Sequence, residues 1–356
     1  MKKNLIKNNK INIGIAGFGE VGKRRFEVIK KNKNFKLIGV CDQNKKNLNS
    51  LDDKIFKFTD YKELLKLKLD ALIICLTNDV AAKVTSAALK KNLHVFCEKP
   101  PATNLSDLIK IINLKRSINK NLILLYGFNH RHHQSIREAI KIIKSNKLGK
   151  IINLKGVYGK SKMIKFNNHD WRTKRKIAGG GILLDQGIHM IDLIRLFAGE
   201  FDEIKSFVMN NFWKYDVEDN AYAILRNKKG IIAMINSSAT QWKHKFELEI
   251  NCQYGTITLG GILSSTKTYG DETLKIQYKN KIKKTMDLKE KVIKYVKDPS
   301  WKDELELFQK YIITNKKNYR GDINDAFQTM KLVFEIYYND KDWRKAYSIY
   351  KPKNVN

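Results

Sequence analysis

A carboxylate and an imidazole stand four residues apart in the segment 179–192, which begins with three glycines. Residues at i and i+4 share one face of a helix, so Asp185 and His189 are expected to reach the same small volume. A carboxylate beside a histidine is a common acid/base arrangement, because the acid orients the ring and favours its charged form. The glycines allow a tight turn and let a large group approach the backbone. The alternative is a helix that happens to carry two polar residues.

Length and composition indicate about two globular domains, because the chain has 356 residues, 42% hydrophobic and 29% charged. The formal net charge is +33, and 58 of the 69 basic residues are lysines scattered along the chain. Proteins that read bases concentrate Arg and Asn on a dedicated helix or strand, and the sequence has no such module. We therefore expect no nucleic-acid partner, although the charge would attract anionic ligands over a long range.

The four cysteines predict reduced thiols. Cys41, Cys75, Cys97 and Cys252 form no C-x-x-C pair, and three of them lie in or beside apolar runs. This pattern is typical of core residues in a cytoplasmic protein rather than of a disulfide framework or a metal site. The apolar run after the basic start is too short for a signal sequence, and no stretch approaches the roughly 18 apolar residues of a membrane span. We expect no membrane partner.

The first third of the chain alternates two kinds of pattern. Short apolar runs, which are typical of strands buried on both faces, occur at 11–16, 37–40, 71–76, 93–97 and 122–126. Helical patterns separate them at 21–32, 61–67, 79–91 and 105–118, the last starting at Thr103 or Asn104. Alternation of this kind predicts a doubly wound parallel sheet, an α/β domain that spans residues 1–127.

The first junction between strand and helix carries a G-x-G-x-x-G pattern. An acidic residue, Asp42, lies 20 positions after the last glycine, at the end of the second predicted strand. Together these features are the fingerprint of a dinucleotide site, in which the glycines allow the turn, the approach of the pyrophosphate and close packing of the helix. The alternative is a purely structural turn. The expected cofactor contacts from this loop are Gly17, Phe18, Gly19, Glu20, Val21 and Gly22.

Asp42 favours NAD as the cofactor, because its carboxylate can accept hydrogen bonds from ribose hydroxyls and would repel a 2′-phosphate. Lys45 and Lys46 lie just beyond it and could offset that repulsion, so NADP stays an alternative. Thr77 and Asn78 follow the strand predicted at 71–76, where the carboxyl edge of the sheet should meet the cofactor.

A lysine follows another predicted strand in the sequence Glu98-Lys99-Pro100-Pro101. At the carboxyl end of a strand beside the cofactor, Lys99 could donate a hydrogen bond to a substrate hydroxyl or carbonyl. A positively charged nicotinamide nearby would lower the pKa of this lysine. We include Glu98 and Lys99 among the cofactor contacts. The alternative is an ordinary surface lysine.

The second half, residues 128–356, has a different character. Strands are expected at 151–158, 204–211, 220–226, 230–237, 246–252, 256–259 and 273–278, several of them joined by short turns. Helical patterns follow at 299–315 and 325–338. This organisation predicts an α+β domain in which helices cover one face of a largely antiparallel sheet.

The connection 155–176 holds eight basic residues and a single acid, Asp170. It also carries Tyr158, His169, Trp171 and Arg172. If this connection lines the substrate pocket it would suit an anionic sugar, because Arg binds phosphate in a bidentate manner and aromatic rings stack. The alternative is an exposed basic loop in a basic protein.

In these motifs the chain resembles the family of glucose–fructose oxidoreductase, inositol dehydrogenase and MocA-like oxidoreductases over nearly its whole length. The resemblance rests on the motifs at 17–22, 98–100, 127–131, 171–172 and 179–192, and on the helix expected at 325–338. It implies a Rossmann domain, a second domain for substrate binding and oligomerisation, NAD(P)-dependent chemistry on sugars, polyols or nucleotide sugars, and no metal. It also implies a homodimer or homotetramer formed through the second sheet. One departure from the family pattern is His132-His133-Gln134, which leaves the pocket wall undefined.

The resemblance matches Lys99, Asp185 and His189 to the catalytic positions of the family. Substrate contacts are expected from Asn129 and Arg131 of the motif at 127–131 and, if the connection 155–176 lines the pocket, from Tyr158, His169, Trp171 and Arg172. The expected substrate is a nucleotide sugar or another anionic sugar. The reaction moves a hydride between nicotinamide and the carbon that bears a secondary hydroxyl of this sugar, with His189 as the proton carrier. The alternatives are an inositol or monosaccharide dehydrogenase, an enzyme that reduces aldehydes or imines, and a cofactor-binding sensor without activity. Asp192 is expected to be structural.

Overall fold

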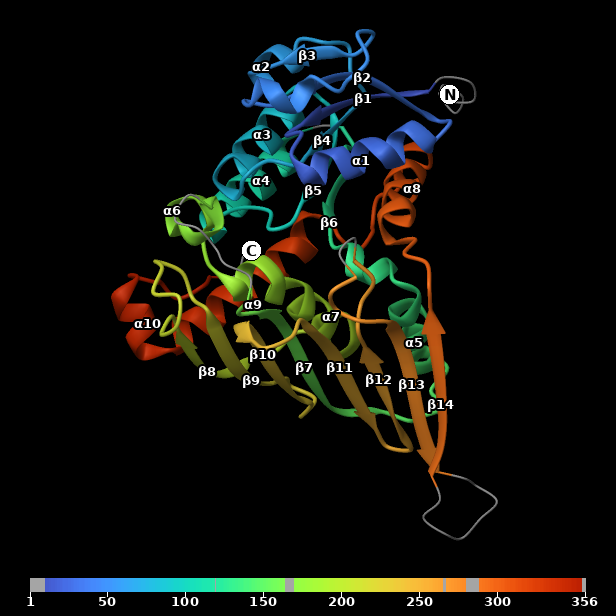
Figure 1. The fold of residues 1–356 in the computed structure, drawn as a ribbon, viewed down its shortest axis with the longest axis vertical. Coiled ribbons are helices and arrows are strands. Elements are labelled where there is room, and N and C mark those ends of the chain that lie inside the picture. Colours follow the sequence, from blue (N-terminus) through green and yellow to red (C-terminus); the bar gives the residue numbers. More distant parts are fainter. Residues whose placement is uncertain (1–9, 119, 164–169, 265–266, 280–287, 354–356) are drawn as a thin grey trace. The chain divides into compact units, whose positions relative to one another are not determined.

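The computed structural model describes residues 10–118, 120–163, 170–264, 267–279 and 288–353. The chain forms two compact units (Figure 1). The first unit combines the residues up to Phe128 with Trp301–Phe327, and the second combines Asn129–Ser300 with the residues from Gln328 onward. The first unit is therefore built from two stretches of the chain that lie far apart in sequence.

The first unit contains a six-stranded parallel sheet in the order β3-β2-β1-β4-β5-β6. This confirms the predicted doubly wound sheet and adds one short edge strand, β3. The strands are β1 (Ile11–Ala16), β2 (Phe35–Cys41), β3 (Phe56–Phe58), β4 (Ala71–Ile74), β5 (His94–Glu98) and β6 (Leu124–Gly127). The helices are α1 (Glu20–Lys31), α2 (Tyr61–Leu64), α3 (Asn78–Lys90) and α4 (Leu105–Ser117), with a 3-10 turn at Lys45–Leu48. Asn104 caps α4 by accepting the N–H of Asp107.

The core of this unit includes the late helix α8 (Ser300–Ile313). Leu305, Phe308 and Ile312 of α8 belong to the same buried cluster as Ile13 and Phe96 of the sheet. Burial of such side chains stabilises a fold by roughly 1.5–3 kcal/mol each. The late helix is therefore an integral part of the first unit.

The second unit contains an eight-stranded sheet in the order β14-β13-β12-β11-β7-β10-β9-β8. The β7 and β10 pair is parallel and the other pairs are antiparallel, which confirms a largely antiparallel sheet. The strands are β7 (Ile151–Ser161), β8 (Glu203–Met209), β9 (Asn220–Arg226), β10 (Ile232–Gln241), β11 (Lys245–Cys252), β12 (Gly255–Gly260), β13 (Glu272–Lys279) and β14 (Leu288–Tyr295). The helices are α5 (Gln134–Lys144), α6 (Arg175–Ala178), α7 (Ile188–Ala198), α9 (Ile323–Asn339) and α10 (Lys341–Ala346). The start of α9, up to Phe327, belongs to the first unit.

The helices of this unit cover one face of its sheet, with α7 against β7 and β10 and α5 against β12 and β13 (Figure 1). Among the described residues, one helical stretch, Arg175–Ala198, is long and apolar enough to cross a membrane by length and composition. Because 83% of its most apolar window is buried inside the protein, its apolar character is accounted for by packing in the core.

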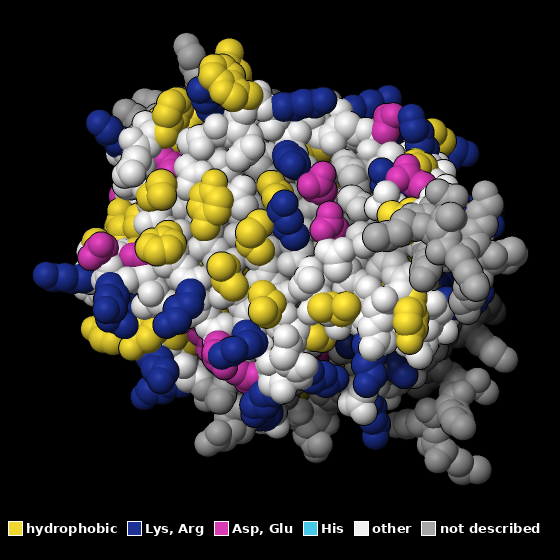
Figure 2. Space-filling view, turned by 90° about the horizontal axis from the view of Figure 1, so that it is seen from below, with side chains coloured by type: hydrophobic (Ala, Val, Ile, Leu, Met, Phe, Trp, Pro, Cys, Tyr) yellow, Lys and Arg dark blue, Asp and Glu magenta, His cyan; other side chains and the backbone are white. Residues whose placement is uncertain are grey.

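The opposite face of this sheet exposes apolar side chains. Phe207 of β8 is 73% exposed and stands directly opposite Tyr222 of β9 in the ladder. Ile224 and Ile232 add to the same part of the surface. Figure 2 shows hydrophobic side chains gathered on the face that is seen from below, with Lys and Arg side chains around them. Exposed apolar side chains that gather on one face are frequent at interaction sites.

Candidate active site

The glycine turn after β1 leaves open space where a phosphate would need it. Gly17 has a φ of +91°, and a Cβ there would lie 2.3 Å from the carbonyl oxygen of Cys75. A Cβ on Gly22 would lie 2.1 Å from the carbonyl oxygen of Gly17. By contrast, a Cβ on Gly19 would meet no described atom within 4 Å. Gly19 is the N-cap of α1 and brings no side-chain acceptor, so the first N–H groups of this helix suit an anionic ligand.

The carboxylate of Asp42 is fixed beside this turn. It accepts the N–H of Phe18 at 2.6 Å through one oxygen and the N–H of Asn44 at 2.8 Å through the other. A carboxylate has about four acceptor positions, so each oxygen keeps one for a ribose hydroxyl. Asp42 thus also holds the glycine turn in place, a role that the fingerprint does not reveal.

The loop after β4 adjoins the glycine turn, because the strand order reverses between β1 and β4 and the two carboxyl ends lie side by side. The N–H of Cys75 donates to the carbonyl of Ala16 at 2.7 Å. Thr77 is the N-cap of α3 without a capping side-chain bond, and Asn78 beside it is buried. The predicted cofactor residues of both loops therefore lie at the switch point of the sheet, where doubly wound proteins bind nucleotides.

Glu98 is held by a buried arginine. Its Oε1 accepts Nε of Arg25 at 2.7 Å, and Nη2 of Arg25 donates to Glu304 of α8 at 2.6 Å. The guanidinium lies between the rings of Phe96 and Trp301, 4.4 and 4.3 Å from their centroids. Burial alone would lower the pKa of Arg25, but the two carboxylates outweigh it and the pKa is raised. Lys99 follows directly and is half-buried. Direct cofactor contacts of Glu98 and Lys99 stay predictions.

In the second unit, the three glycines make room for neighbouring protein groups. Gly179 has a φ of +82°, and a Cβ on Gly180 would lie 2.4 Å from the hydroxyl of Tyr337. A Cβ on Gly181 would lie 2.0 Å from the carbonyl oxygen of Glu218. The large group that approaches this backbone, so far as the described residues show, is thus the Glu218 and Tyr337 pair.

Glu218 caps the helix that carries Asp185 and His189. Its carboxylate accepts the N–H groups of Gly181 at 2.7 Å and Leu183 at 3.0 Å, and its carbonyl accepts that of Ile182 at 3.1 Å. The hydroxyl of Tyr337 donates to the same carboxylate at 2.6 Å. Burial raises the pKa of Glu218, and these donors oppose that shift only in part. Because the first N–H groups of a helix lack internal partners, this arrangement fixes the start of the helix.

The helix opens with a π-helical turn over Leu183–Gly187 before α7 begins. A Cβ on Gly187 would lie 2.1 Å from Oγ of Ser237 on β10, so this turn packs closely on the sheet. A π turn is wider than an α turn and is frequent at functional sites. Asp185 and His189 are therefore separated by a wide turn. Asp185 contacts basic side chains, whereas His189 contacts an aromatic ring.

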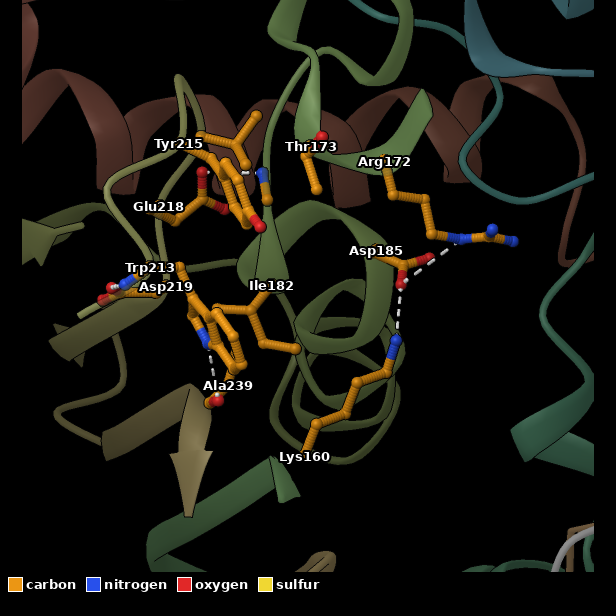
Figure 3. Close-up of a pocket in the computed structure, with 12 residues that line it drawn as sticks. Lys160, Arg172, Thr173, Ile182, Asp185, Trp213, Tyr215, Glu218, Asp219 and Ala239 are labelled. Atoms are coloured by element: carbon orange, nitrogen blue, oxygen red, sulfur yellow. Dashed lines mark hydrogen bonds and ion pairs between the residues drawn. The ribbon is translucent and has the colours of Figure 1, made fainter. Parts of the chain in front are cut away.

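Asp185 lies between two cations at the edge of a pocket (Figure 3). Nζ of Lys160, from the end of β7, is 3.0 Å from its Oδ2, and Nε of Arg172 is 4.0 Å from the same oxygen. Figure 3 shows the end of Lys160 directed at this carboxylate, whereas Arg172 turns its Nε toward it and extends the rest of its guanidinium away. The other side of the pocket is aromatic, formed by Trp213 and Tyr215 from the β8–β9 loop.

His189 is buried against a second histidine. Its ring stacks on that of His130, with centroids 3.7 Å apart and planes 14° from parallel. Nε2 of His130 is 3.0 Å from the hydroxyl of Tyr158, whose ring lies 6.4 Å from that of His189. Burial raises the pKa of Tyr158 well above its ordinary value, with a further contribution from the charge of Asp185. Tyr158 therefore stands near both Asp185 and His189.

Two of the predicted substrate residues hold other side chains. Asn129 directs its Oδ1 at Nδ1 of His130, 3.1 Å away. Arg131 donates from Nε to Asp192 at 2.6 Å and again from Nη2, and Thr329 donates to the same carboxylate at 3.2 Å. Asp192 is buried, as expected of a structural residue. Substrate contacts of Asn129 and Arg131 stay predictions.

The aromatic and basic residues of the connection 155–176 differ in whether they line the pocket. Trp171 and Arg172 belong to a 3-10 turn that Asp170 caps, and the guanidinium of Arg172 lies 4.5 Å from the Trp171 ring centroid. Arg172 lines the pocket, whereas Tyr158 is buried beside it. His169 lies outside the described residues. Within the described ranges, no group of three His, Cys, Asp or Glu side chains could hold a metal ion.

Some residues of this site were not identified from sequence. Lys160 was counted only among the basic residues, and Glu218, Trp213 and His130 carried no assigned role. Lys160 and Glu218 lie 25 and 33 residues from Asp185, so no local spacing links them to it. One feature of the sequence could have indicated His130, namely its place in the motif Gly-Phe-Asn-His-Arg at 127–131.

A nucleotide cradle at the switch point of a doubly wound sheet, in a chain whose second unit carries a pocket lined by charged and aromatic side chains, is the arrangement of a two-domain NAD-binding oxidoreductase. Comparison with known families agrees. Residues 11–126 match the oxidoreductase family with an NAD-binding Rossmann fold, and residues 136–258 match the GFO/IDH/MocA C-terminal domain. The chain belongs to the GFO/IDH/MocA oxidoreductase family, which confirms the resemblance drawn from its motifs.

Several relatives have assigned names. The chain is 25% identical to a myo-inositol 2-dehydrogenase of Thermotoga maritima over 73% of this chain and 78% of the relative. It is 30% identical to a glucose-6-phosphate 3-dehydrogenase of Bacillus subtilis over 53% of this chain and 54% of the relative. The solved structure of a Lactobacillus plantarum myo-inositol 2-dehydrogenase superimposes with a TM-score of 0.77 at 21% identity, covering 93% and 97% of the two chains, and supports the fold.

The residues of the first unit fit NAD. The open space beside Gly19 and the uncapped start of α1 suit the pyrophosphate, and the fixed carboxylate of Asp42 suits the ribose. When bound, the nicotinamide supplies a carbon that accepts or gives a hydride. The NAD-binding assignment made from the fingerprint is thereby confirmed by the family match.

Proposed function

We propose that this protein is an NAD-dependent oxidoreductase that acts on a secondary hydroxyl of an anionic sugar, such as a nucleotide sugar or a sugar phosphate. The observation that carries the proposal is the pair of cations on Asp185. Lys160 and Arg172 approach one oxygen of this carboxylate, and Arg172 is 41% exposed in its side chain. A phosphate or carboxylate of the substrate in hydrogen-bond contact would be a stronger partner for Arg172 than the carboxylates of Asp170 and Asp185, which lie 3.7 and 4.0 Å from its nitrogens. The Bacillus subtilis relative named for a sugar phosphate supports this substrate class.

Three side chains would carry the proton and charge in this reaction. His189 would take the hydroxyl proton during oxidation, and a histidine is suited to this task because its ordinary pKa is about 6.5. Asp185, which pairs with Lys160, would hold the substrate hydroxyl. Lys99 would donate a hydrogen bond to the oxygen that gains charge.

The first experiment tests the role of His189. The variant His189→Ala should lose most of its turnover, and it should bind NAD with unchanged affinity because the cofactor cradle lies in the other unit. Lys99→Ala should likewise lower kcat. Normal turnover in His189→Ala would contradict the proposed mechanism.

The second experiment tests the substrate class. Formation of reduced nicotinamide is followed with myo-inositol, glucose, glucose 6-phosphate and a UDP-sugar, each with NAD and with NADP. We expect turnover of an anionic sugar and a preference for NAD, because Asp42 opposes a 2′-phosphate. Turnover confined to the neutral compounds would contradict the anionic substrate and support the inositol or monosaccharide alternative.

A matched pair of variants isolates the pocket cation. Arg172→Gln should raise KM for the anionic sugar roughly 10- to 100-fold, since a lost charge-assisted hydrogen bond costs roughly 1.5–3 kcal/mol. Lys176→Gln removes the same charge from an exposed position in the same connection and should leave KM unchanged. Equal KM values in the two variants would show that Arg172 does not bind the substrate.

We also propose that a second copy of the chain covers the open sheet face, in a reducing cytoplasm that suits four free thiols. The exposed side chains of Phe207 and Ile224 support an apolar contact between copies. Light scattering should show a dimer or tetramer, and Ile224→Lys should dissociate it. A monomeric wild-type protein would contradict this assembly.

A further inference from the structure

His130 covers one face of the His189 ring. The two rings are parallel to within 14° at 3.7 Å, and the two residues are only 7% and 4% exposed. In a close-packed interior, a ring that lies flat against another cannot tilt unless its neighbour moves. We infer that His130 is a positioning residue that sets the plane of the His189 ring. This inference rests on the proposed role of His189 as the proton carrier.

His130 is itself held at both ring nitrogens. Nδ2 of Asn129 donates to Oγ of Ser300 at 3.1 Å, which assigns the other amide atom, Oδ1, as the acceptor that faces His130. Nδ1 of His130 faces this acceptor, and Nε2 lies 3.0 Å from the hydroxyl of Tyr158. Both partners come from the second unit, and together they hold the His130 ring at its two nitrogens.

Two variants separate the flat face from the ring nitrogens. His130→Phe keeps a planar ring against His189, and His130→Leu keeps apolar volume without a planar face. Both remove the same hydrogen bonds to Asn129 and Tyr158, so only planarity distinguishes them. We expect kcat of the Leu variant to fall roughly 100-fold, the loss that a misplacement of about 1 Å can cause, while the Phe variant stays within a few-fold of wild type. KM for NAD should be unchanged in both.

A neighbouring histidine gives a matched control. His133 meets His130 at its edge, 5.5 Å away and 69° from parallel, and it pairs with Glu272 at 2.8 Å. His133→Gln keeps a donor for Glu272 and should leave kcat within a few-fold of wild type. A loss in His133→Gln as large as that in His130→Leu would attribute the effect to general disruption of the segment and overturn the inference.

A second readout does not depend on turnover. In NMR spectra of protein labelled with ¹³C-histidine, the His189 signal is assigned by its disappearance in His189→Ala. Because a stacked ring shifts the resonances of its partner, this signal should stay near its wild-type position in His130→Phe and move in His130→Leu. Equal kcat values and equal shifts in the Phe and Leu variants would overturn the inference. Full turnover in His189→Ala would instead overturn the proposed function, so the two failures are distinguishable.

Discussion

The carboxylate of Glu218 accepts the backbone N–H of Gly181 at 2.7 Å, while its carbonyl occupies the place where a side chain on Gly181 would begin. This relationship accounts for the third glycine of the segment 179–181. It also links the start of the Asp185 and His189 helix to a residue of the β8–β9 connection. The orientation of both candidate catalytic side chains thus depends on one buried acid.

Glu218→Gln should destabilise the second unit. The amide group would direct an N–H at a site that now receives donors from Gly181, Leu183 and Tyr337. The loss of one or two buried hydrogen bonds should cost about 1–3 kcal/mol each, which lowers Tm by several degrees. Differential scanning calorimetry measures this shift. Tyr337→Phe removes a single donor and should have a smaller effect; an unchanged Tm in Glu218→Gln would contradict the capping role.

The pH dependence of stability should contain a contribution from His94. Burial lowers its pKa to about 4, partly opposed by Asp70, and its Nδ1 accepts the N–H of Ile123 at 2.9 Å. The unfolded chain therefore binds a proton near pH 6.5 that the folded chain does not bind until about pH 4. The contribution is fully present above pH 6.5 and is lost as the pH falls, up to roughly 3 kcal/mol.

His94→Asn keeps an acceptor for Ile123 but does not titrate. The difference in unfolding free energy between wild type and this variant, measured by urea denaturation, should change between pH 6.5 and pH 4. A difference that stays constant over this range would show that His94 titrates normally in the folded state.

Two glycines of the nucleotide turn should respond differently to alanine. Gly22→Ala must displace the carbonyl of Gly17 and should destabilise the first unit by about 1–3 kcal/mol. Gly19→Ala places its methyl group in open space and should fold normally, but it should weaken NAD binding about tenfold or more. Thermal melting without ligand and fluorescence titration with NADH measure the two effects. Unchanged NADH affinity in Gly19→Ala would place the pyrophosphate elsewhere.

Arg25→Met should destabilise the first unit strongly. The substitution leaves the carboxylates of Glu98 and Glu304 without their shared cation, and breaking a buried ion pair typically costs 3–5 kcal/mol. Lys23→Ala, two residues earlier on the exposed side of α1, serves as the control. Equal urea midpoints for the two variants would mean that the Arg25 network contributes nothing to stability.

The sheet of the first unit was predictable because its strands are buried on both faces and read as short apolar runs. The two missed strands lacked that signal. β3 has three residues, Phe-Lys-Phe, at the sheet edge, and β14 is the lysine-rich edge strand of the second sheet. An edge strand is specified by its partner strand and by charges that prevent aggregation, so its own sequence resembles a loop.

The candidate site was predictable only where its residues follow one another in sequence. The fingerprint at 17–22 and Asp42 lie together as expected. They belong to one strand–helix–strand unit, so the number of residues between them fixes their relative positions. The contacts of Asp185 with Lys160 and of His189 with His130 arise from packing between elements. The π turn also separates the expectation from the structure, because residues at i and i+4 share one face only in a regular α-helix.

The place of α8 in the first unit has a consequence for synthesis on the ribosome. Residues up to Phe128 emerge long before Leu305, Phe308 and Glu304, which complete the core and the ion-pair network of the same unit. At a typical ~5–20 residues per second, roughly 10–30 s separate the two stretches. A nascent or truncated chain that ends before residue 301 would therefore expose part of the nucleotide-binding core, and it would be a target for chaperones and proteases until the late helix arrives.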